Sequence, residues 1–121
     1  MKTVLLVDDS AVMLSLLQTM LADVYRLRVA INGVKALGIA AMQKPDLVIL
    51  DLHMPGMDGH EVLQKLKTNP ATAHIPVVLM SGTRTEQDEA RAREGGAAAF
   101  LAKPIEPEAL RALLARLLNP A

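Results

Sequence analysis

Short apolar runs alternate about five times along the chain with longer stretches in which apolar residues recur at helical spacing. The short runs, which predict strands, lie at 4–7, 27–30, 47–50, 77–80 and 99–101. The longer stretches predict helices at 10–22, 33–42, 58–68, 85–94 and from about 106 onward. Ser10 and Asp58 are suited to cap two of these helices, and Gly95-Gly96 is suited to end a third.

Five strands that alternate with five helices predict an α/β fold with a parallel sheet covered by helices on both faces. The connections are short, so right-handed crossovers are expected throughout. No charge block, low-complexity tract or Ser/Gly linker interrupts the 121 residues. We therefore expect residues 1–121 to form a single domain, without an output domain.

Composition excludes several classes of function. Thirteen basic and thirteen acidic residues cancel to a formal charge of zero, which disfavours bulk electrostatic binding of nucleic acid or of an anionic membrane. The chain has no cysteine and only 2% aromatic residues, so a thiolate zinc site is excluded and a base-stacking surface is disfavoured. No apolar run approaches the ~20 residues that span a bilayer, and no signal-peptide pattern is present. We expect a soluble cytoplasmic domain without membrane insertion or direct nucleic-acid binding.

Polar residues follow four of the predicted strands. Asp8 and Asp9 come directly after the first strand, Asp51 after the third, Ser81 after the fourth and Lys103 after the fifth. Each of them alone is equally compatible with a helix cap or a solvated loop. Ligands of open α/β sheets bind at the carboxyl ends of the strands, where the strand order reverses. If these four strands are neighbours, the five side chains meet in one crevice.

The charge balance of such a crevice calls for a cation. Three carboxylates and one lysine sum to about −2, and each like-charged pair at ~4 Å costs about 4 kcal/mol at an effective dielectric of about 20. A hard divalent ion offsets this repulsion, and an all-oxygen site suits Mg²⁺ or Mn²⁺. Zinc is a poor alternative, because His53, His60 and His74 show no paired ligand spacing. His60 and His74 are interpreted as ordinary surface or loop histidines.

A cation, a lysine and a hydroxyl around one carboxylate also fit phosphoryl transfer. The cation and Lys103 would neutralise phosphoryl oxygens, Ser81 would donate a hydrogen bond, and the carboxylate would be the nucleophile. The chain has no GxxxxGK loop for a nucleotide. The sequence therefore predicts a site that receives a phosphoryl group and does not bind ATP.

Four segments together resemble the receiver domain of two-component response regulators, in particular single-domain, chemotaxis-regulator-like members. The segments are Val7-Asp8-Asp9-Ser10, Asp51-Leu52-His53-Met54-Pro55-Gly56-Met57-Asp58-Gly59, Met80-Ser81-Gly82 and Lys103-Pro104-Ile105. Each is moderately specific alone, and their order and spacing are highly specific. The resemblance covers the chain from end to end and implies a flavodoxin-like, doubly wound (βα)5 fold with strand order 2-1-3-4-5.

The resemblance implies a role for each polar residue. Asp51 matches the phosphorylated aspartate, Ser81 the switch hydroxyl and Lys103 the phosphate-binding lysine. The residues matched to the metal site are Asp8, Asp9, Asp51 and His53, the last through its backbone carbonyl. Asp9 and Asp51 correspond to direct ligands, whereas Asp8 corresponds to an acid usually reached through a water.

The resemblance also implies partners. Family members accept phosphate from a phosphohistidine on a sensor histidine kinase or histidine phosphotransfer domain, or from donors such as acetyl phosphate, and they hydrolyse their own acyl phosphate. They are not conventional enzymes. Their downstream protein binds the face formed by the fourth helix, fifth strand and fifth helix. A monomer or a weak, phosphorylation-dependent dimer is expected.

Three further predictions concern residues near this site. Phe100 matches the aromatic residue that changes rotamer on activation; the alternative is that it is simply the only phenylalanine of the core. The bond before Pro104 matches a position that is usually cis in the family. As a hypothesis, His53 and Thr83 tune the rate of dephosphorylation.

The predicted first helix departs from the family pattern. Leu14 stands where many receivers carry a basic residue, and we assign Met13 and Leu14 to core packing. Val12 and Leu16 lie at the margin of the apolar stripe, in the region where the family docks the histidine donor. Packing and donor docking remain alternatives for these two side chains.

Other functions on this scaffold need features that the sequence lacks. A haloacid-dehalogenase-like phosphatase needs an aspartate two residues after the nucleophile, where His53 stands. A flavodoxin-like electron carrier needs a phosphate-cradling loop and aromatic residues. A receiver that no longer takes phosphate is disfavoured by the retention of all five polar positions. Residues 25–33 faintly resemble receivers attached to cyclic-dinucleotide enzymes. This resemblance is too weak to assign an output, and the sequence does not identify the cognate kinase.

Overall fold

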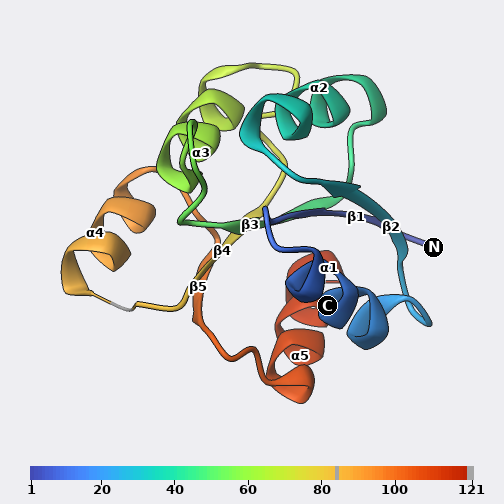
Figure 1. Cartoon of the computed structure of the whole chain (residues 1–121). Helices are drawn as coiled ribbons and strands as arrows, with labels where there is room; N and C mark the ends of the chain where they lie inside the picture. Colours follow the sequence, from blue (N-terminus) through green and yellow to red (C-terminus); the bar gives the residue numbers. More distant parts are fainter. Residues whose placement is uncertain (84, 120–121) are drawn as a thin grey trace.

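A computed structural model describes residues 1–83 and 85–119 and confirms the predicted alternation of strands and helices (Figure 1). The strands are β1 (Thr3–Val7), β2 (Arg26–Ala30), β3 (Leu47–Asp51), β4 (Val77–Ser81) and β5 (Ala99–Ala102). The helices are α1 (Ala11–Leu21), α2 (Gly33–Gln43), α3 (Gly59–Thr68), α4 (Glu86–Glu94) and α5 (Pro107–Leu118). Asp51 and Ser81 are the last residues of their strands, where the sequence placed them just beyond the strand.

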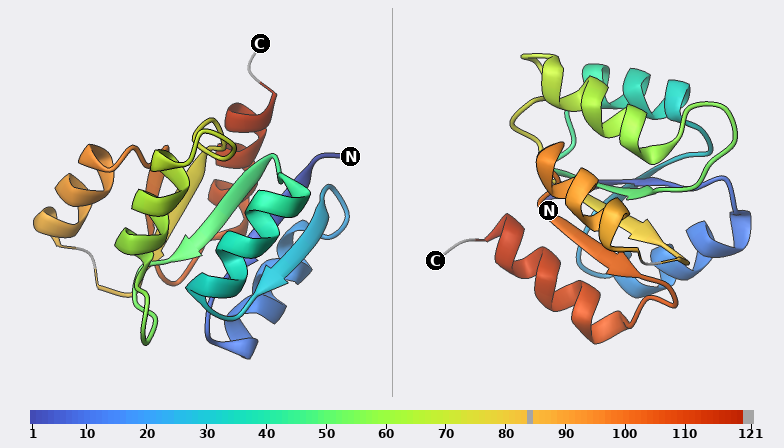
Figure 2. Two further views of the ribbon diagram at one scale, coloured as in Figure 1. Left: turned by 90° about the horizontal axis from the view of Figure 1, so that it is seen from above. Right: turned by 90° about the vertical axis from the view of Figure 1, so that its left-hand side faces the viewer.

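The five strands form one parallel sheet in the order β2-β1-β3-β4-β5, as the resemblance implied. Helices α1 and α5 cover one face, and α2, α3 and α4 cover the other (Figures 1 and 2). The strand arrows point away from the end of the molecule at which both termini lie (left view of Figure 2). The functional residues at the strand ends are therefore on the side opposite the termini.

Strand side chains alternate between two apolar clusters, because successive residues of a strand point to opposite faces of the sheet. In β1, Leu5 and Val7 pack with α2 and α3, whereas Val4 and Leu6 pack with α1 and α5. All four side chains are fully buried, and each buried aliphatic side chain contributes about 1.5–3 kcal/mol relative to exposure. The two clusters hold the strand ends in fixed positions.

Helix starts are fixed by side chains that accept a backbone hydrogen bond from three residues further on. Ser10 accepts from the amide of Met13, and Asp58 from that of Glu61, as predicted. Both caps lie directly beside the strand ends that carry the acidic residues. Local sequence thus fixes where α1 and α3 leave the sheet.

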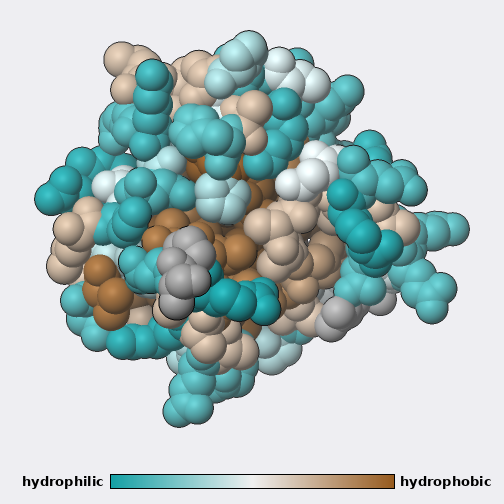
Figure 3. All heavy atoms as spheres, turned by 180° about the vertical axis from the view of Figure 1, so that it is seen from behind, coloured by the Kyte–Doolittle hydropathy of each residue, from teal (hydrophilic) through white to brown (hydrophobic). Residues whose placement is uncertain are grey.

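Figure 3 shows the molecule from behind, where apolar residues appear at the centre of the face within a polar rim. Among residues 1–83 and 85–119, no helix is long and apolar enough to cross a membrane.

Candidate functional site

Two aspartates from separate strand ends lie around the ammonium group of Lys103. The Nζ atom lies 3.0 Å from Asp51 Oδ1 and 3.2 Å from Asp8 Oδ2. Asp8 follows β1, Asp51 ends β3, and Lys103 follows β5. Parallel pairing brings these ends to one edge of the sheet, so the crevice expected from the sequence is present.

Asp9 completes an acidic group at this edge. Carboxylate oxygens of Asp8, Asp9 and Asp51 all lie within 4.8 Å of one another. Asp8 and Asp51 are buried, and Asp9 is exposed. One oxygen of Asp8 accepts a hydrogen bond from the amide of Ser10 at 3.0 Å, which orients this carboxylate at the start of α1.

The charges of the crevice perturb each other. Burial raises the pKa of Asp51 above its ordinary value, and the nearby Asp8 and Asp9 add to this, although the hydrogen bond from Lys103 opposes it. Burial lowers the pKa of Lys103, but its hydrogen bonds and charge interactions with Asp51 and Asp8 outweigh burial and raise it overall. A single ammonium thus faces three carboxylates and does not neutralise them.

The donor set fits a hard divalent cation. Three carboxylates, two of them buried, converge from separate elements, and Mg²⁺ and Mn²⁺ prefer such oxygen ligands. An added divalent charge would also offset the burial that disfavours ionised Asp51.

The first residue of α3, Gly59, packs closely against the backbone at the end of β3. Gly59 donates its backbone N–H to the carbonyl of Leu52 at 2.9 Å. A Cβ atom at Gly59 would lie 2.7 Å from the carbonyl oxygen of Asp51 and from Cα of Leu52. Any larger residue would displace the backbone where the loop between β3 and α3 meets α3, so position 59 requires glycine. The sequence pattern did not predict this requirement.

The hydroxyl of Ser81 lies at this edge but is bonded within its own loop. It donates to the carbonyl of Thr83 at 2.6 Å and accepts from the amide of Thr83 at 3.1 Å. Ser81 is fully buried, whereas Thr83 is exposed. The backbone carbonyl of Ser81 accepts a hydrogen bond from the amide of Lys103 at 2.8 Å. This bond connects the end of β4 to the start of the β5–α5 connection.

Phe100 lies on β5 beside a cavity of about 360 Å³. The side chain is half-buried and packs against the cluster under α2, α3 and α4. The cavity is bounded by α4 and by the small residues that precede Phe100, which include Ala97, Ala98 and Ala99. The structure therefore leaves room next to the only phenylalanine.

The remaining predicted residues have simpler settings. The peptide bond between Lys103 and Pro104 is cis, as expected. His53 lies exposed in the loop after β3. Leu14 is buried in the α1–α5 cluster, which confirms its assignment to the core, whereas 72% of Val12 and 49% of Leu16 are exposed.

The interpretation of His60 as a surface histidine is wrong. His60 is only 8% exposed, and its Nε2 lies 3.4 Å from Asp88 Oδ1 in the first turn of α4. His60 lies on α3 and contacts α4. The local sequence pattern does not show contacts between two helices, so this burial was not predicted. His74 is exposed, as predicted.

The sequence model of the response regulator receiver domain family matches residues 4–115. The chain belongs to this family. The chain is 44% identical over 104 residues to response regulator PleD of Caulobacter vibrioides, covering 85% of this chain and 23% of PleD. It is 42% identical over 103 residues to a probable cyclic di-GMP phosphodiesterase of Vibrio cholerae, covering 85% of this chain and 23% of that protein. The chain therefore spans under a quarter of the length of these two relatives.

Other relatives match along most of their length. The polar-differentiation response regulator DivK of Brucella anthropi is 34% identical over 105 residues, covering 86% of this chain and 85% of DivK. The solved structure of Vibrio cholerae chemotaxis protein CheY4 superposes with a TM-score of 0.92 at 29% identity, covering 98% and 99% of the two chains. The Mn²⁺-bound form of response regulator Rcp1 superposes with a TM-score of 0.84 at 28% identity, covering 100% and 97%. The fold is the CheY-like flavodoxin fold.

Proposed function

We propose that this chain is a phosphorylation-driven switch that accepts a phosphoryl group on Asp51. The observation that carries this proposal is the contact of Asp51 with Lys103, beside two further aspartates at the carboxyl edge of the sheet. Membership of the receiver family supports the same reading.

In the proposed reaction a carboxylate oxygen of Asp51 attacks the phosphorus of a phosphohistidine on a sensor histidine kinase or histidine phosphotransfer domain. The new O–P bond forms as the N–P bond breaks, and the imidazole leaves with the electron pair. Lys103 is placed to stabilise negative charge on the phosphoryl oxygens, because its Nζ already lies 3.0 Å from the attacking carboxylate.

Asp8, Asp9 and Asp51 would hold the Mg²⁺ or Mn²⁺ ion, together with the backbone carbonyl of His53. Such an ion supplies positive charge that the carboxylates and the phosphoryl oxygens share. The similar protein Rcp1 has a Mn²⁺-bound form, which supports the binding of a divalent ion by this chain.

The switch would then act through Ser81. A phosphoryl group offers new acceptor oxygens, and Ser81 reaches one only by giving up its hydrogen bond to Thr83. The loop between β4 and α4 would move inward, and Phe100 would turn into the adjacent cavity. These movements would change the surface formed by α4, β5 and α5, where a downstream protein would bind.

The signal would end by self-catalysed hydrolysis. Water attacks the phosphorus, the O–P bond to Asp51 breaks, and inorganic phosphate leaves. His53 and Thr83 are exposed near the site and would tune this rate, whereas Val12 and Leu16 on α1 would contact the histidine donor. We place the protein in the cytoplasm as a monomer or a weak, phosphorylation-dependent dimer.

Beryllofluoride, a stable mimic of the phosphoryl group, tests the proposal with Mg²⁺ present. Backbone amide NMR signals of the β4–α4 loop and β5 should shift on its addition. The Asp51→Asn variant should show no such shift. Equal shifts in both proteins, or none in the parent, would overturn the proposal.

A further inference from the structure

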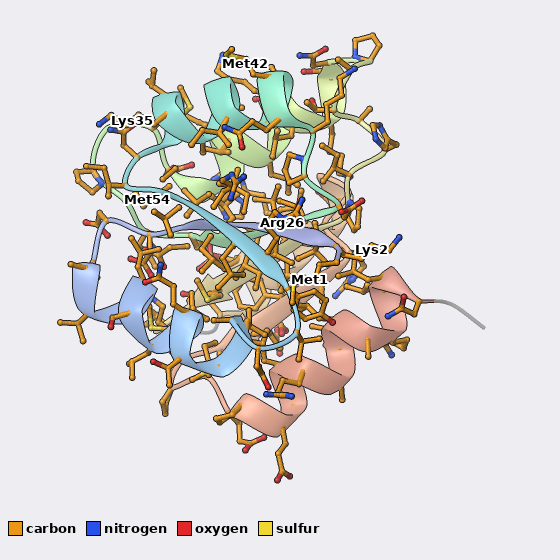
Figure 4. The ribbon with its side chains drawn as sticks, turned by 90° about the vertical axis from the view of Figure 1, so that its right-hand side faces the viewer. Met1, Lys2, Arg26, Lys35, Met42 and Met54 are labelled. Atoms are coloured by element: carbon orange, nitrogen blue, oxygen red, sulfur yellow. The ribbon has the colours of Figure 1, made fainter. Side chains whose placement is uncertain are left out.

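Strand β2 is an edge of the sheet and is bonded only to β1. Figure 4 looks directly onto this edge, with β2 across the front, α2 above it and α1 and α5 below. An edge strand presents unpaired backbone N–H and C=O groups to any further strand that can align with it. The chemistry of the flanking side chains decides which strand that is.

The segment around this edge is basic, although the whole chain has a formal charge of zero. Residues 24–45 contain no aspartate or glutamate and four cations, which are Arg26, Arg28, Lys35 and Lys44. Figure 4 shows Arg26 at the start of β2 beside Lys2, and Lys35 on α2 above the strand. The neutral total therefore hides a local positive surface.

None of these four cations is ion-paired among residues 1–83 and 85–119. Arg28 donates from Nε to the side-chain oxygen of Gln43 at 2.8 Å and from Nη1 to the carbonyl of Leu27 at 3.1 Å. Both partners are neutral. The positive charge of the edge is thus available to a carboxylate from outside.

The same segment concentrates exposed apolar side chains. Eight large hydrophobic residues are exposed in the part of the chain that the structure describes, and five of them fall within 24–42. These five are Val24, Val29, Ile31, Val34 and Met42, exposed by 40%, 41%, 52%, 70% and 86%. They account for more than half of the exposed large apolar side chains.

Within β2 itself, the charged and the apolar side chains lie on opposite sides of the strand. Ala30 belongs to the cluster under α2 and α3, whereas Leu27 packs on the cluster of α1 and α5. Because strand side chains alternate, Arg26 and Arg28 project to the side of α2, and Leu27 and Val29 to the side of α1. The edge therefore carries a basic row and an apolar row.

A second copy of this chain is a poor occupant. Antiparallel pairing of two β2 strands about Arg28 would place each Arg28 directly opposite the other, and shifting the pairing by two residues would place Arg26 opposite Arg28. Like charges directly opposite each other destabilise a strand pair. Positive side chains on an edge strand protect it against self-pairing and still admit a strand of opposite charge.

We propose that the β2 edge binds an extended segment of a partner protein in which acidic and apolar residues alternate. The segment would add a sixth strand, with its carboxylates opposite Arg26 and Arg28 and its apolar side chains beside Leu27 and Val29. Backbone hydrogen bonds would supply affinity, and the two rows would supply specificity. A lipid surface would use the charge and the apolar residues but would not form backbone hydrogen bonds along the strand.

The test uses the unphosphorylated protein and a blocked synthetic peptide of alternating glutamate and valine, so its failure leaves the proposed phosphoryl chemistry untouched. Titration followed by backbone amide NMR should shift the signals of β2 and the start of α2.

The Arg26→Glu/Arg28→Glu variant should weaken binding by about tenfold or more. The Arg26→Gln/Arg28→Gln variant should show a smaller loss. The matched Arg91→Glu/Arg93→Glu variant changes two exposed arginines on α4 and should bind as the parent does.

Four results would overturn the proposal. The first is an absence of β2 shifts at millimolar peptide. The second is equal binding of an alternating lysine–valine peptide. The third is a set of β2 shifts with vesicles of phosphatidylglycerol and phosphatidylcholine but none with the acidic peptide. The fourth is a concentration-dependent dimer that protects the β2 amides.

Discussion

The hydroxyl of Ser81 is held by both backbone groups of Thr83, at 2.6 Å to the carbonyl and 3.1 Å to the amide. The side chain lies at the end of β4, next to the strand that carries Asp51, yet it is turned into its own loop. Its exchange of Thr83 for a phosphoryl oxygen would connect the chemistry at Asp51 to the start of α4.

The Ser81→Ala variant should separate phosphorylation from response. Asp51 should still accept a phosphoryl group, while the amide shifts of β5 and α5 on beryllofluoride binding should fall well below those of the parent. Loss of the buried hydroxyl should lower the free energy of unfolding by about 1 kcal/mol. The Ser81→Thr variant keeps the hydroxyl and serves as the control. A full β5 response in Ser81→Ala would contradict this role.

Divalent ions should stabilise the folded protein through the three aspartates. Mg²⁺ at about a hundredfold excess over its Kd should add about 2.7 kcal/mol to the free energy of unfolding. The Asp9→Asn variant should lose most of this gain, because it removes one of the converging carboxylates. The Glu94→Gln variant removes an exposed charge on α4 and should keep the gain. Urea unfolding with and without Mg²⁺ measures the effect, and equal gains in both variants would refute the metal site.

The raised pKa of Asp51 makes stability depend on pH in the absence of divalent ions. Between the ordinary value of 3.8 and the raised native value, the folded state binds more protons than the unfolded state, so the contribution of Asp51 to stability falls as pH rises. The Asp51→Asn variant should therefore be more stable than the parent at neutral pH. This gain should disappear below about pH 3.8, where both states are protonated. Unfolding curves over this pH range without metal check it, and a destabilised variant at neutral pH would contradict the expectation.

Phosphoryl lifetime should depend on the two exposed residues beside the site. The His53→Ala and Thr83→Ala variants should each change the rate at which phosphorylated protein loses phosphate, because both exposed residues stand two positions after a residue of the site, Asp51 or Ser81. The His74→Ala variant changes an exposed histidine in the segment before β4 and should leave the lifetime unchanged. Time courses of intact mass measure the decay. Unchanged lifetimes in both site variants would refute tuning by these residues.

The fold was predictable because strands and helices each have a hydrophobic pattern that can be read over a few neighbouring residues. The apolar run at 47–50 predicts β3, and the cap residues Ser10 and Asp58 predict where α1 and α3 begin. The site was predictable because a parallel sheet brings strand ends to one edge, so that Asp51 and Lys103 meet despite their separation in sequence.

What the sequence did not predict depends on packing between elements. The burial of His60 follows from the approach of α4 to α3, and the need for glycine at 59 follows from the 2.7 Å approach of its Cβ position to Asp51. The basic surface at β2 was hidden because the acidic residues that cancel it in the total charge lie outside residues 24–45. The first two features become visible only when the segments that pack together are placed side by side.

Phosphorylation of Asp51 itself can be measured directly. Intact mass spectrometry after incubation with acetyl phosphate and Mg²⁺ should show the addition of one phosphoryl group, which borohydride trapping and peptide mapping should place on Asp51. The Lys103→Met variant should be modified more slowly, because the cation 3.0 Å from the nucleophile is gone. A parent protein that stays unmodified with this donor and with a phosphorylated histidine phosphotransfer domain, or an adduct that persists in the Asp51→Asn variant, would contradict the account.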